Sequence, residues 1–400
     1  MKNKAIIAKL AESYDSFYLY DERTIKANIV RLQAAFPQVE FLYSMKCNPH
    51  QQVLKTIFGQ GLWADAASLG EVLMAEAHGL SKEQIYYSAP GKRNSDIETA
   101  LEKAVIIADS IDELHRIDKI AECRGETVSV GIRINPNFTL YDDACAFNKF
   151  GIDEDQAAAF VREQPCKNIK VTGIHVHLKS QELCTETLIG YHKKMFALAE
   201  QFSELCGGLE YVNFGSGIGV TYAPEEQNVD LQRLSEMFNG QLETFKFQHP
   251  STIIMIETGR YVACKAGIYA TKVIDRKTSC GKTLLILRST LNGFARPAME
   301  RIFSAYGDDT APVEPFYTCR NAFQFETLKD DEPTETVTLF GNLCTGIDAV
   351  ARDVLMPHLE YGDVIVMNNA GAYAASITPM QFSSQEKPAE LFLTENGAVI

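Results

Sequence analysis

One lysine stands where its side chain could do chemistry. Lys46 follows a short apolar and aromatic run, Phe41–Met45, and Asn48-Pro49 directly after it is a signal that ends a regular element. We therefore expect Lys46 at the exit of a buried strand, where the chain turns toward a helix. A lysine is costly to bury in its charged form, so its pKa should fall and its amine should become nucleophilic. An ordinary surface lysine at a strand end is the alternative.

Two histidines separated by a single residue form a second candidate. On a strand, the side chains of His175 and His177 would face the same side. That spacing could bind a metal ion, but no third ligand is evident nearby in the sequence. We therefore expect no metal site, and both core packing and a ligand-facing histidine remain open for this pair.

A glycine-rich turn, Asn213–Gly219, could hold a phosphate group. Glycines let backbone N–H groups close on a phosphate, and the N-terminus of a following helix adds a favourable dipole. A dinucleotide-binding fingerprint would instead open the first helix of a βαβ unit, with an acidic residue about twenty residues later. Neither condition is met here, so this turn does not indicate a dinucleotide site.

Charged residues and a lone thiol complete the candidates. Glu257-Thr258-Gly259-Arg260 pairs a carboxylate with a guanidinium, and Arg260 would add positive charge to the phosphate site. An ordinary surface pair between Glu257 and Arg260 is the alternative. Cys344 lies in a glycine-containing loop, where a buried structural cysteine would be the usual outcome.

A regular alternation of strands and helices would position these residues. Strand-like runs alternate with amphipathic stretches of helical length, which matches a (β/α)8 barrel in count and size. A doubly wound sheet remains open, because periodicity cannot show closure. In a barrel the chemistry lies at the C-terminal ends of the strands, where these candidates fall. The predicted strands are Phe41–Met45, Leu62–Ala66, Ile85–Ser88, Val105–Ala108, Val128–Ile134, Val171–Leu178, Tyr211–Phe214 and Ile253–Glu257.

The pattern changes after about Gly267, where strands dominate and long helical patterns are nearly absent. We predict a barrel over residues 24–267 and a β domain over residues 268–400. The segment 1–23 should belong to the β domain, because its strand Ser16–Tyr20 precedes any helix and must join a sheet made elsewhere.

Composition limits the partners. The chain has 400 residues, 46% of them apolar, and a net charge of −14, which would repel nucleic acid and anionic membranes. Ten cysteines are scattered singly, which is typical of reduced thiols in the cytoplasm. We see no signal peptide and no apolar run long enough to span a bilayer. We expect a cytoplasmic protein that acts on a small molecule.

Several segments together resemble one enzyme family. Tyr-Ser-Met-Lys-Cys-Asn around Lys46 resembles the Tyr-Ala-x-Lys-Ala-Asn segment of pyridoxal-phosphate decarboxylases of the ornithine and diaminopimelate decarboxylase family. The segments around Asp65, Glu257, Cys344 and Tyr373 resemble family motifs in the same order. The resemblance implies a fold-type III enzyme, a (β/α)8 barrel followed by a C-terminal all-β domain, that uses pyridoxal phosphate to decarboxylate an amino acid.

The resemblance also assigns roles. Lys46 would carry the cofactor, His177 would lie flat against its ring, and Glu257 would keep the pyridine nitrogen protonated, which favours decarboxylation over racemisation. Cys344 would supply a proton from the partner subunit, which implies a homodimer with shared active sites. Lys179 occupies a position that is usually glycine. The remaining implied cofactor contacts are Asp65, Arg133, Ser180, Gly215, Ser216, Gly217, Gly259, Arg260 and Tyr373.

Departures from the family concern the substrate. Arg296, in Asn-Gly-Phe-Ala-Arg-Pro-Ala, resembles the arginine that binds a substrate carboxylate in diaminopimelate decarboxylases, and Tyr373 would also contact the substrate. Thr345 stands where those enzymes carry a glutamate, and Glu300 stands where they carry a tyrosine. The pattern resembles siderophore-pathway decarboxylases most, so we predict a citryl-diaminopropionate-like substrate, with Arg288 and Arg296 on its citryl arm.

Other functions remain open at this stage. A diaminopimelate decarboxylase or an amino-acid racemase is the enzymatic alternative. From another class, the chain could be an inactive regulatory homologue. Such a protein would lose the lysine or the cysteine, whereas this chain keeps both Lys46 and Cys344.

Overall fold

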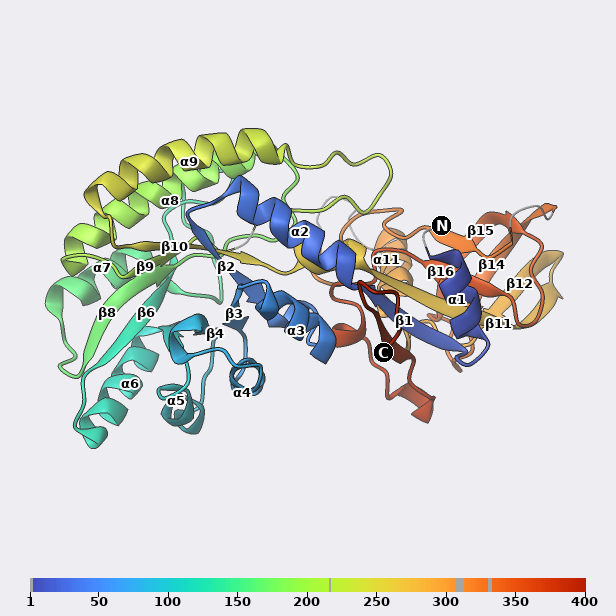
Figure 1. The fold of residues 1–400 in the computed structure, drawn as a ribbon, viewed down its shortest axis with the longest axis horizontal. Coiled ribbons are helices and arrows are strands. Elements are labelled where there is room, and N and C mark those ends of the chain that lie inside the picture. The colour runs from blue at the N-terminus through green and yellow to red at the C-terminus, as the bar shows by residue number, and fades with distance from the viewer. Residues whose placement is uncertain (1–2, 216, 307–312, 330–332) are drawn as a thin grey trace.

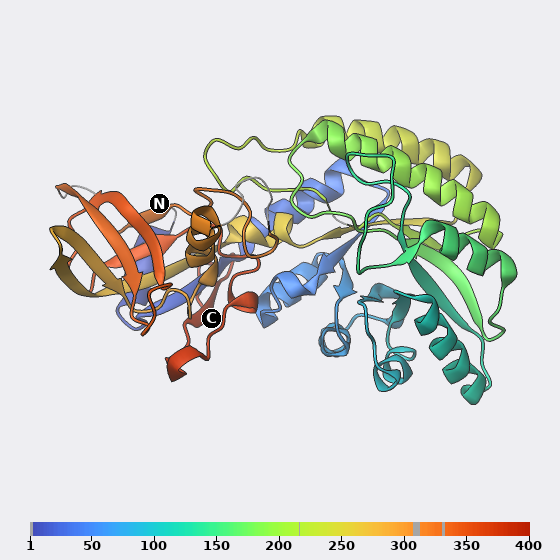
Figure 2. The ribbon, with the colours of Figure 1, turned by 180° about the vertical axis from the view of Figure 1, so that it is seen from behind.

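Two structural parts lie end to end along the longest axis of the molecule, a barrel surrounded by helices and a body made mostly of strands (Figure 1). The structure is a computed structural model, and it describes residues 3–215, 217–306, 313–329 and 333–400. Seen from behind, the same two parts again lie end to end (Figure 2).

Eight parallel strands in the described part of the chain form a closed barrel. The eighth barrel strand pairs with the first, with Ile256 opposite Phe41. The fourth strand pairs with the fifth, with Ile107 opposite Gly131, so the ring of strands is complete. This closure confirms the predicted barrel and excludes a doubly wound sheet. In chain order the strands are β2 (Val39–Ser44), β3 (Trp63–Ala66), β4 (Ile85–Ser88), β5 (Val105–Ala108), β6 (Val128–Asn135), β8 (Ile169–His175), β9 (Tyr211–Asn213) and β10 (Ile253–Thr258).

Helices cover the outside of this barrel. Helix α6 shows why such segments fold: Ser110 caps its N-terminus through Glu113, Gly125 ends it in a left-handed conformation, and Leu114 and Ile117 face the barrel. The covering helices are α2 (Glu22–Ala35), α3 (Gln51–Gly59), α4 (Leu69–Ala77), α5 (Asn94–Ala100), α6 (Ile111–Arg124), α7 (Glu154–Glu163), α8 (Thr185–Cys206) and α9 (Leu231–Gln248). The short strand β7 (Ile152–Asp153) pairs with β6.

A tyrosine fills the interior of the barrel. The ring of Tyr211 packs with Tyr86, and the two centroids lie 4.9 Å apart. A Cβ atom at Gly173 would lie 2.2 Å from the Tyr211 ring, and one at Gly131 would lie 2.1 Å from its hydroxyl. These two glycines therefore make room for Tyr211, so the barrel has a packed core rather than a pore.

The β body is organised around the long strand β11 (Gly267–Ser279), which follows the short helix α10 (Arg260–Ala263). Strand β1 (Ser16–Asp21) pairs with β11 and with β17, so the N-terminal strand joins the C-terminal sheet as predicted. The other strands are β12 (Lys282–Leu287), β13 (Phe325–Thr327), β14 (Thr334–Gly341), β15 (Ala349–Pro357), β16 (Val364–Met367) and β17 (Ala389–Leu393).

Two helices in this part were not predicted. Helix α1 (Lys4–Ala11) precedes β1, and helix α11 (Ala295–Tyr306) lies in the region that we expected to be nearly free of helices. Pro297 stands in the first turn of α11, where the missing N–H is not needed, so the proline is compatible with the helix.

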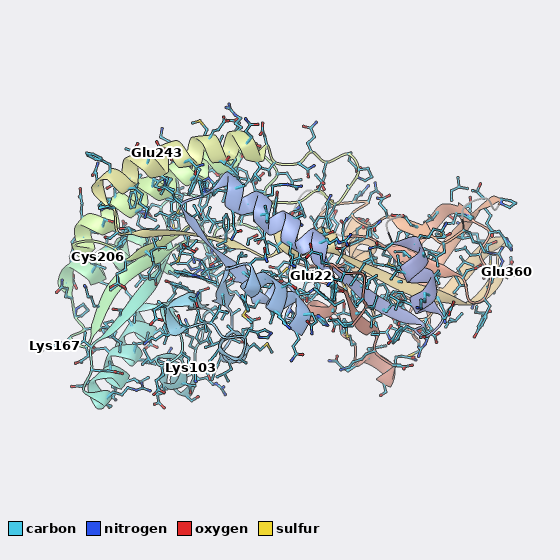
Figure 3. The ribbon with its side chains drawn as sticks, in the orientation of Figure 1. Glu22, Lys103, Lys167, Cys206, Glu243 and Glu360 are labelled. Atoms are coloured by element: carbon cyan, nitrogen blue, oxygen red, sulfur yellow. The ribbon has the colours of Figure 1, made fainter. Side chains whose placement is uncertain are left out.

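Contacts across the junction hold the two parts together. The carboxylate of Glu22, labelled in Figure 3, accepts a hydrogen bond of 2.7 Å from the backbone N–H of Glu395 in the C-terminal segment. Lys26 pairs with both carboxylates, at 2.9 Å and 2.8 Å. Within the described ranges, no helix is both long and apolar enough to cross a membrane.

Candidate functional site

Lys46 lies at the C-terminal end of the barrel, in a single 3-10 turn, Met45–Cys47, directly after β2. Its Nζ atom lies 3.0 Å from Oδ2 of Asp65, the carboxylate near the end of β3. The other oxygen of Asp65 accepts a hydrogen bond of 2.9 Å from Ser88, the last residue of β4. Three successive barrel strands therefore converge on this lysine, as the strand-end argument predicts.

The expected direction of the Lys46 pKa is wrong for the free side chain. Burial by itself would lower the pKa of Lys46. The negative charges of Asp65 and Glu257 outweigh burial and raise the pKa above its ordinary value. Lys46 is therefore held as an ammonium group beside Asp65.

Glu257, near the end of β10, is surrounded by three polar side chains. Its Oε1 atom lies 3.0 Å from Nε2 of His175 and accepts a hydrogen bond of 3.1 Å from Nδ2 of Asn213. Its Oε2 atom lies 3.9 Å from Nδ1 of His177. Burial would raise the pKa of Glu257, but both histidines and Lys46 hold it well below its usual range. Burial lowers the pKa of His177 to about 3, so the ring is neutral near pH 7.

The glycine turn lies beside the loop that follows β8. The backbone N–H of Glu182 donates to the carbonyl oxygen of Gly217 at 2.8 Å, and the N–H of Gly219 donates back to the carbonyl oxygen of Glu182 at 2.9 Å. The N–H of Gly215 is fixed by the side chain of Asn213 at 2.8 Å. Ser216 lies outside the described residues.

Arg260 and Tyr373 close the pocket from the side of the β body. The guanidinium of Arg260 lies over the ring of Tyr373, with its carbon 4.8 Å from the ring centroid. Tyr373 has a left-handed backbone (φ 49°), which is uncommon for a bulky residue and is found preferentially at functional sites. Its backbone N–H donates to the carbonyl oxygen of Cys47, next to Lys46, at 2.9 Å.

Lys46, Glu257 and Tyr373 line one pocket together with Ser180. The hydroxyl of Ser180 lies 3.5 Å from Nε2 of His177, which lines the same pocket. Arg133 lies behind the pocket wall, where its Nη2 atom donates to the carbonyl oxygen of His177 at 3.5 Å. The pocket is lined by Ser44, Lys46, His177, Ser180, Gln181, Ile218, Glu257, Gly259, Arg260 and Tyr373.

The two arginines predicted to bind substrate contact different residues of the protein. Arg296 is fully buried and donates to the hydroxyls of Tyr222 at 3.0 Å and Thr318 at 2.6 Å. Arg288 donates instead to Gln385 at 3.0 Å and to Glu386 at 3.3 Å, in the segment that follows Tyr373.

Cys344 is exposed and does not line the Lys46 pocket of its own chain. Its Sγ atom lies 3.7 Å from the hydroxyl of Ser383. Buried Asp348 holds the loop that carries Cys344 and Thr345, because it accepts hydrogen bonds from the N–H groups of Leu343 at 2.9 Å and Leu291 at 3.0 Å. The thiol is thus presented on a fixed loop at the surface.

Comparison with known proteins identifies the family. A family model described as "Pyridoxal-dependent decarboxylase, pyridoxal binding domain" matches residues 22–264. The chain belongs to this family.

Its relatives and structural neighbours cover nearly its whole length. The L-glutamyl-[BtrI acyl-carrier protein] decarboxylase of Niallia circulans is 31% identical over 99% of this chain and 92% of that protein. The 2-[(L-alanin-3-ylcarbamoyl)methyl]-2-hydroxybutanedioate decarboxylase of Staphylococcus aureus is 28% identical over 94% of each chain. The crystal structure of diaminopimelate decarboxylase from Helicobacter pylori complexed with L-lysine has a TM-score of 0.83 at 26% identity, covering 98% of this chain and 95% of that one. The chain is therefore a pyridoxal-phosphate-dependent decarboxylase of an amino acid or an amino-acid conjugate.

The pocket of this decarboxylase fits pyridoxal phosphate. Gly215 has a left-handed backbone (φ +63°), and a Cβ atom there would lie 2.3 Å from the carbonyl oxygen of Val176, so a side chain would close the space beside the turn. The buried Nε atom of Arg260 has no acceptor among the described residues, which an anion would supply. An ionised Glu257 suits a protonated pyridine nitrogen, and Lys46, once its ammonium group has lost a proton, offers an amine that suits a carbonyl carbon.

Sequence reasoning missed two residues that the decarboxylase uses to build this site. Asn213 bonds both Glu257 and the glycine turn, and its place inside the quoted glycine motif could have indicated it. Tyr222 joins Arg260, at 2.7 Å, to Arg296, and no local pattern marks it.

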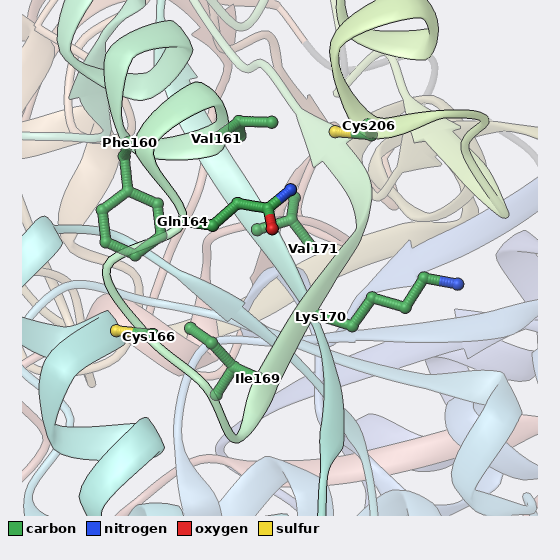
Figure 4. Close-up of a pocket in the computed structure, with 8 residues that line it drawn as sticks. All are labelled: Phe160, Val161, Gln164, Cys166, Ile169, Lys170, Val171 and Cys206. Atoms are coloured by element: carbon green, nitrogen blue, oxygen red, sulfur yellow. The ribbon is translucent and has the colours of Figure 1, made fainter.

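A second pocket of the decarboxylase lies at the opposite end of the strands (Figure 4). It is lined by Phe160 and Val161 of α7, by Cys206 at the end of α8, and by Ile169 at the start of β8. Since β8 begins at Ile169 and ends at His175, this pocket belongs to the N-terminal face of the barrel, where barrel enzymes do not place their chemistry.

Proposed function

We propose that this decarboxylase acts on a citryl conjugate of diaminopropionate, an intermediate of siderophore biosynthesis. The observation that carries the proposal is Thr345, beside Cys344, where diaminopimelate decarboxylases carry a glutamate that recognises the distal aminocarboxylate. The named substrate of the Staphylococcus aureus relative bears an alanine part and a hydroxybutanedioate part, so its distal end is rich in carboxylates rather than amines.

The site residues divide the work as follows. Bound pyridoxal phosphate supplies an electron sink for the electron pair left by the departing carboxylate. Glu257 holds a proton on the pyridine nitrogen, because its own pKa is depressed and it stays ionised at neutral pH. His177 presents a neutral ring, and Lys46, paired with Asp65, supplies the amine that carries the cofactor.

The phosphate group is held by the glycine turn and by Arg260. Ser216 and Gly217 would offer backbone N–H groups, while Gly215, whose own N–H is taken by Asn213, would leave room for the phosphate at the turn. Arg260 adds a positive charge close by, with its ring contact to Tyr373 fixing its position. Gly259 lets the chain pass Cys47 closely, since a Cβ atom there would lie 2.9 Å from the Cβ atom of Cys47.

The proton for the substrate's α-carbon comes from Cys344 of the partner subunit in a homodimer. Cys344 is exposed and does not line the pocket of its own chain, so a thiol that reaches a substrate must do so from a second copy. Thr345 enters the same composite site with it. Arg288 lies beside the segment 383–386 that contacts Cys344, so its predicted contact with the citryl arm would also be made from the partner.

A substrate panel tests this proposal. Purified holoenzyme is incubated with citryl-diaminopropionate, meso-diaminopimelate, ornithine and lysine, and released carbon dioxide is measured. We expect kcat/KM for the citryl conjugate to exceed that for each free amino acid by about a hundredfold or more, because binding energy from the distal arm aligns the bond that breaks. Efficient turnover of meso-diaminopimelate would instead favour a diaminopimelate decarboxylase.

A second candidate substrate is an aminoacyl group carried by a protein. The Niallia circulans relative, which is similar over 99% of this chain, is named for an acyl-carrier-protein substrate. Adding a glutamyl-loaded acyl-carrier protein to the same panel discriminates the two candidates, because only a carrier-directed enzyme should prefer it to the citryl conjugate.

A further inference from the structure

Five side chains beside the cofactor pocket form a closed ring of hydrogen bonds. The two arginines, Arg260 and Arg296, donate to the hydroxyl of Tyr222 at 2.7 Å and 3.0 Å. On the other side, Arg296 donates to Thr318 at 2.6 Å, and Thr318 donates to Oε1 of Glu314 at 2.8 Å. Arg260 completes the ring by pairing with Oε2 of Glu314.

The ring is short of negative charge. It contains two guanidinium groups and one carboxylate, and buried cations are stable only when anions or dipoles compensate them. The Nε atoms of Arg260 and Arg296 are both buried without a hydrogen-bond partner among the described residues. Each arginine therefore keeps at least its Nε–H donor unused, and that of Arg260 is the donor assigned above to the cofactor's phosphate, so Glu314 is the carboxylate that serves the guanidinium groups of the ring.

Glu314 is the most accessible charged member of the ring. Its side chain is 18% exposed, whereas that of Arg260 is 6% exposed and Arg296 is fully buried. Glu314 lies on the irregular segment 313–320, while Arg260 begins helix α10 and Arg296 lies in the first turn of helix α11. If one partner leaves the ring, it is therefore this carboxylate.

We propose that Glu314 is a specificity-determining residue that holds the place of a substrate carboxylate between Arg260 and Arg296. A carboxylate on the distal arm of the substrate displaces Glu314 and takes over its contacts with Arg260 and Thr318. A substrate without such a carboxylate leaves the Arg260–Glu314 pair intact. This inference deepens the proposed function and rests on it for the class of substrate, because a carboxylate-rich arm is what the ring would select.

Binding of citrate to the holoenzyme tests the inference without turnover. The dissociation constant of citrate is measured by calorimetry for the wild type, Glu314→Gln and Glu314→Ala, with cofactor occupancy followed by absorbance. We expect both variants to bind citrate about tenfold more tightly or better, because a competing negative charge is removed. Glu225→Gln, which removes an exposed carboxylate outside the ring, should leave the constant unchanged.

The outcomes separate this inference from the proposed function. If citrate binds the Glu314 variants no more tightly than the wild type, the inference is overturned, whatever substrate the panel identifies. Loss of cofactor from both variants would also overturn it, because Glu314 would then be a positioning residue for Arg260. Tighter citrate binding by an enzyme that does not turn over the citryl conjugate would keep the inference and reject the substrate.

Discussion

The Nε2 atom of His175 lies 3.0 Å from Oε1 of Glu257, and both side chains are almost completely buried. The sequence left the role of His175 open between core packing and a ligand. The contact shows instead that His175 supports the carboxylate next to the pocket. Together with His177, it offsets the cost of burying an ionised carboxylate there.

His175→Asn should therefore move the acid limb of the pH–activity profile to higher pH. Because the contact with His175 favours the ionised form of Glu257, its removal should raise the pKa of Glu257, so the carboxylate is protonated more easily. The profile of kcat from neutral pH down to the lowest pH at which the protein stays folded checks this. His192→Asn is a matched control, since His192 is also buried but packs on Phe238. An unchanged acid limb in His175→Asn would contradict this role.

Borohydride reduction should attach the cofactor irreversibly to Lys46. The amine is the group at the pocket that can join a carbonyl carbon, and it lies between Asp65 and Tyr373. Peptide mass spectrometry after reduction should show the added mass on the peptide that contains Lys46. Lys46→Ala should lack it, while Lys55→Ala, on the exposed side of α3, should keep it. A label on any other lysine would show that Lys46 is not the carrier.

The barrel was predictable because its strands are apolar runs that turn signals separate. Ile85–Ser88 and Val105–Ala108 match β4 and β5 at both ends. Lys46, Asp65 and Glu257 meet because the C-terminal ends of barrel strands share one face. Helix α11 was missed because strand-like runs dominate this part of the sequence, although Pro297 stands in a first helical turn, where a proline is allowed.

The rest of the site depends on contacts between residues that are far apart in the sequence. Arg260 meets Glu314, which is 54 residues away, and no local pattern marks such a pair. The direction of the Lys46 pKa was wrong for the same reason, because the sequence places Lys46 at a strand end but does not show that the carboxylate of Asp65 lies 3.0 Å from its amine. The domain boundaries, the homodimer and the cytoplasmic location stay predictions.

Mixing Lys46→Ala and Cys344→Ala chains should restore activity that neither variant has alone. If the active sites are shared, a hybrid dimer contains one site with both residues intact. Random mixing should give about a quarter of wild-type activity, because half of the dimers are hybrid and one of their two sites works. Mixing Lys46→Ala with the double variant should restore none. Absence of recovery, with subunit exchange demonstrated by mass spectrometry, would count against shared sites.

Lys179→Gly, which restores the residue usual in the family, should weaken cofactor binding. Lys179 donates to Oε2 of Glu182 at 2.9 Å and lies over the ring of Tyr141, 4.9 Å from its centroid, while the backbone of Glu182 bonds Gly217. Its loss should loosen the loop that carries His177 against the glycine turn. We expect an increase of about three- to tenfold in the dissociation constant of pyridoxal phosphate, measured by fluorescence titration. Lys194→Met, which breaks the ion pair with Asp143, is the control and should leave the constant unchanged.

Glu300 should make the stability of the protein fall between pH 5 and 8. Burial raises its pKa from the ordinary 4.5 to about 7, although its carboxylate accepts a hydrogen bond of 2.8 Å from the backbone N–H of Asn321. The folded state therefore binds the proton more tightly than the unfolded state, and the stability that the neutral acid contributes is present below pH 4.5 and lost as pH rises through 7. Glu300→Gln cannot ionise, so it should not lose this stability as the pH rises. The difference in free energy of unfolding between Glu300→Gln and the wild type should therefore be larger at pH 8 than at pH 5, by about 1 to 3 kcal/mol. Urea unfolding of both proteins at the two pH values measures this difference, and exposed Glu225→Gln should show none. A difference between Glu300→Gln and the wild type that is the same at both pH values would mean that Glu300 is already ionised at pH 5, as an accessible carboxylate would be.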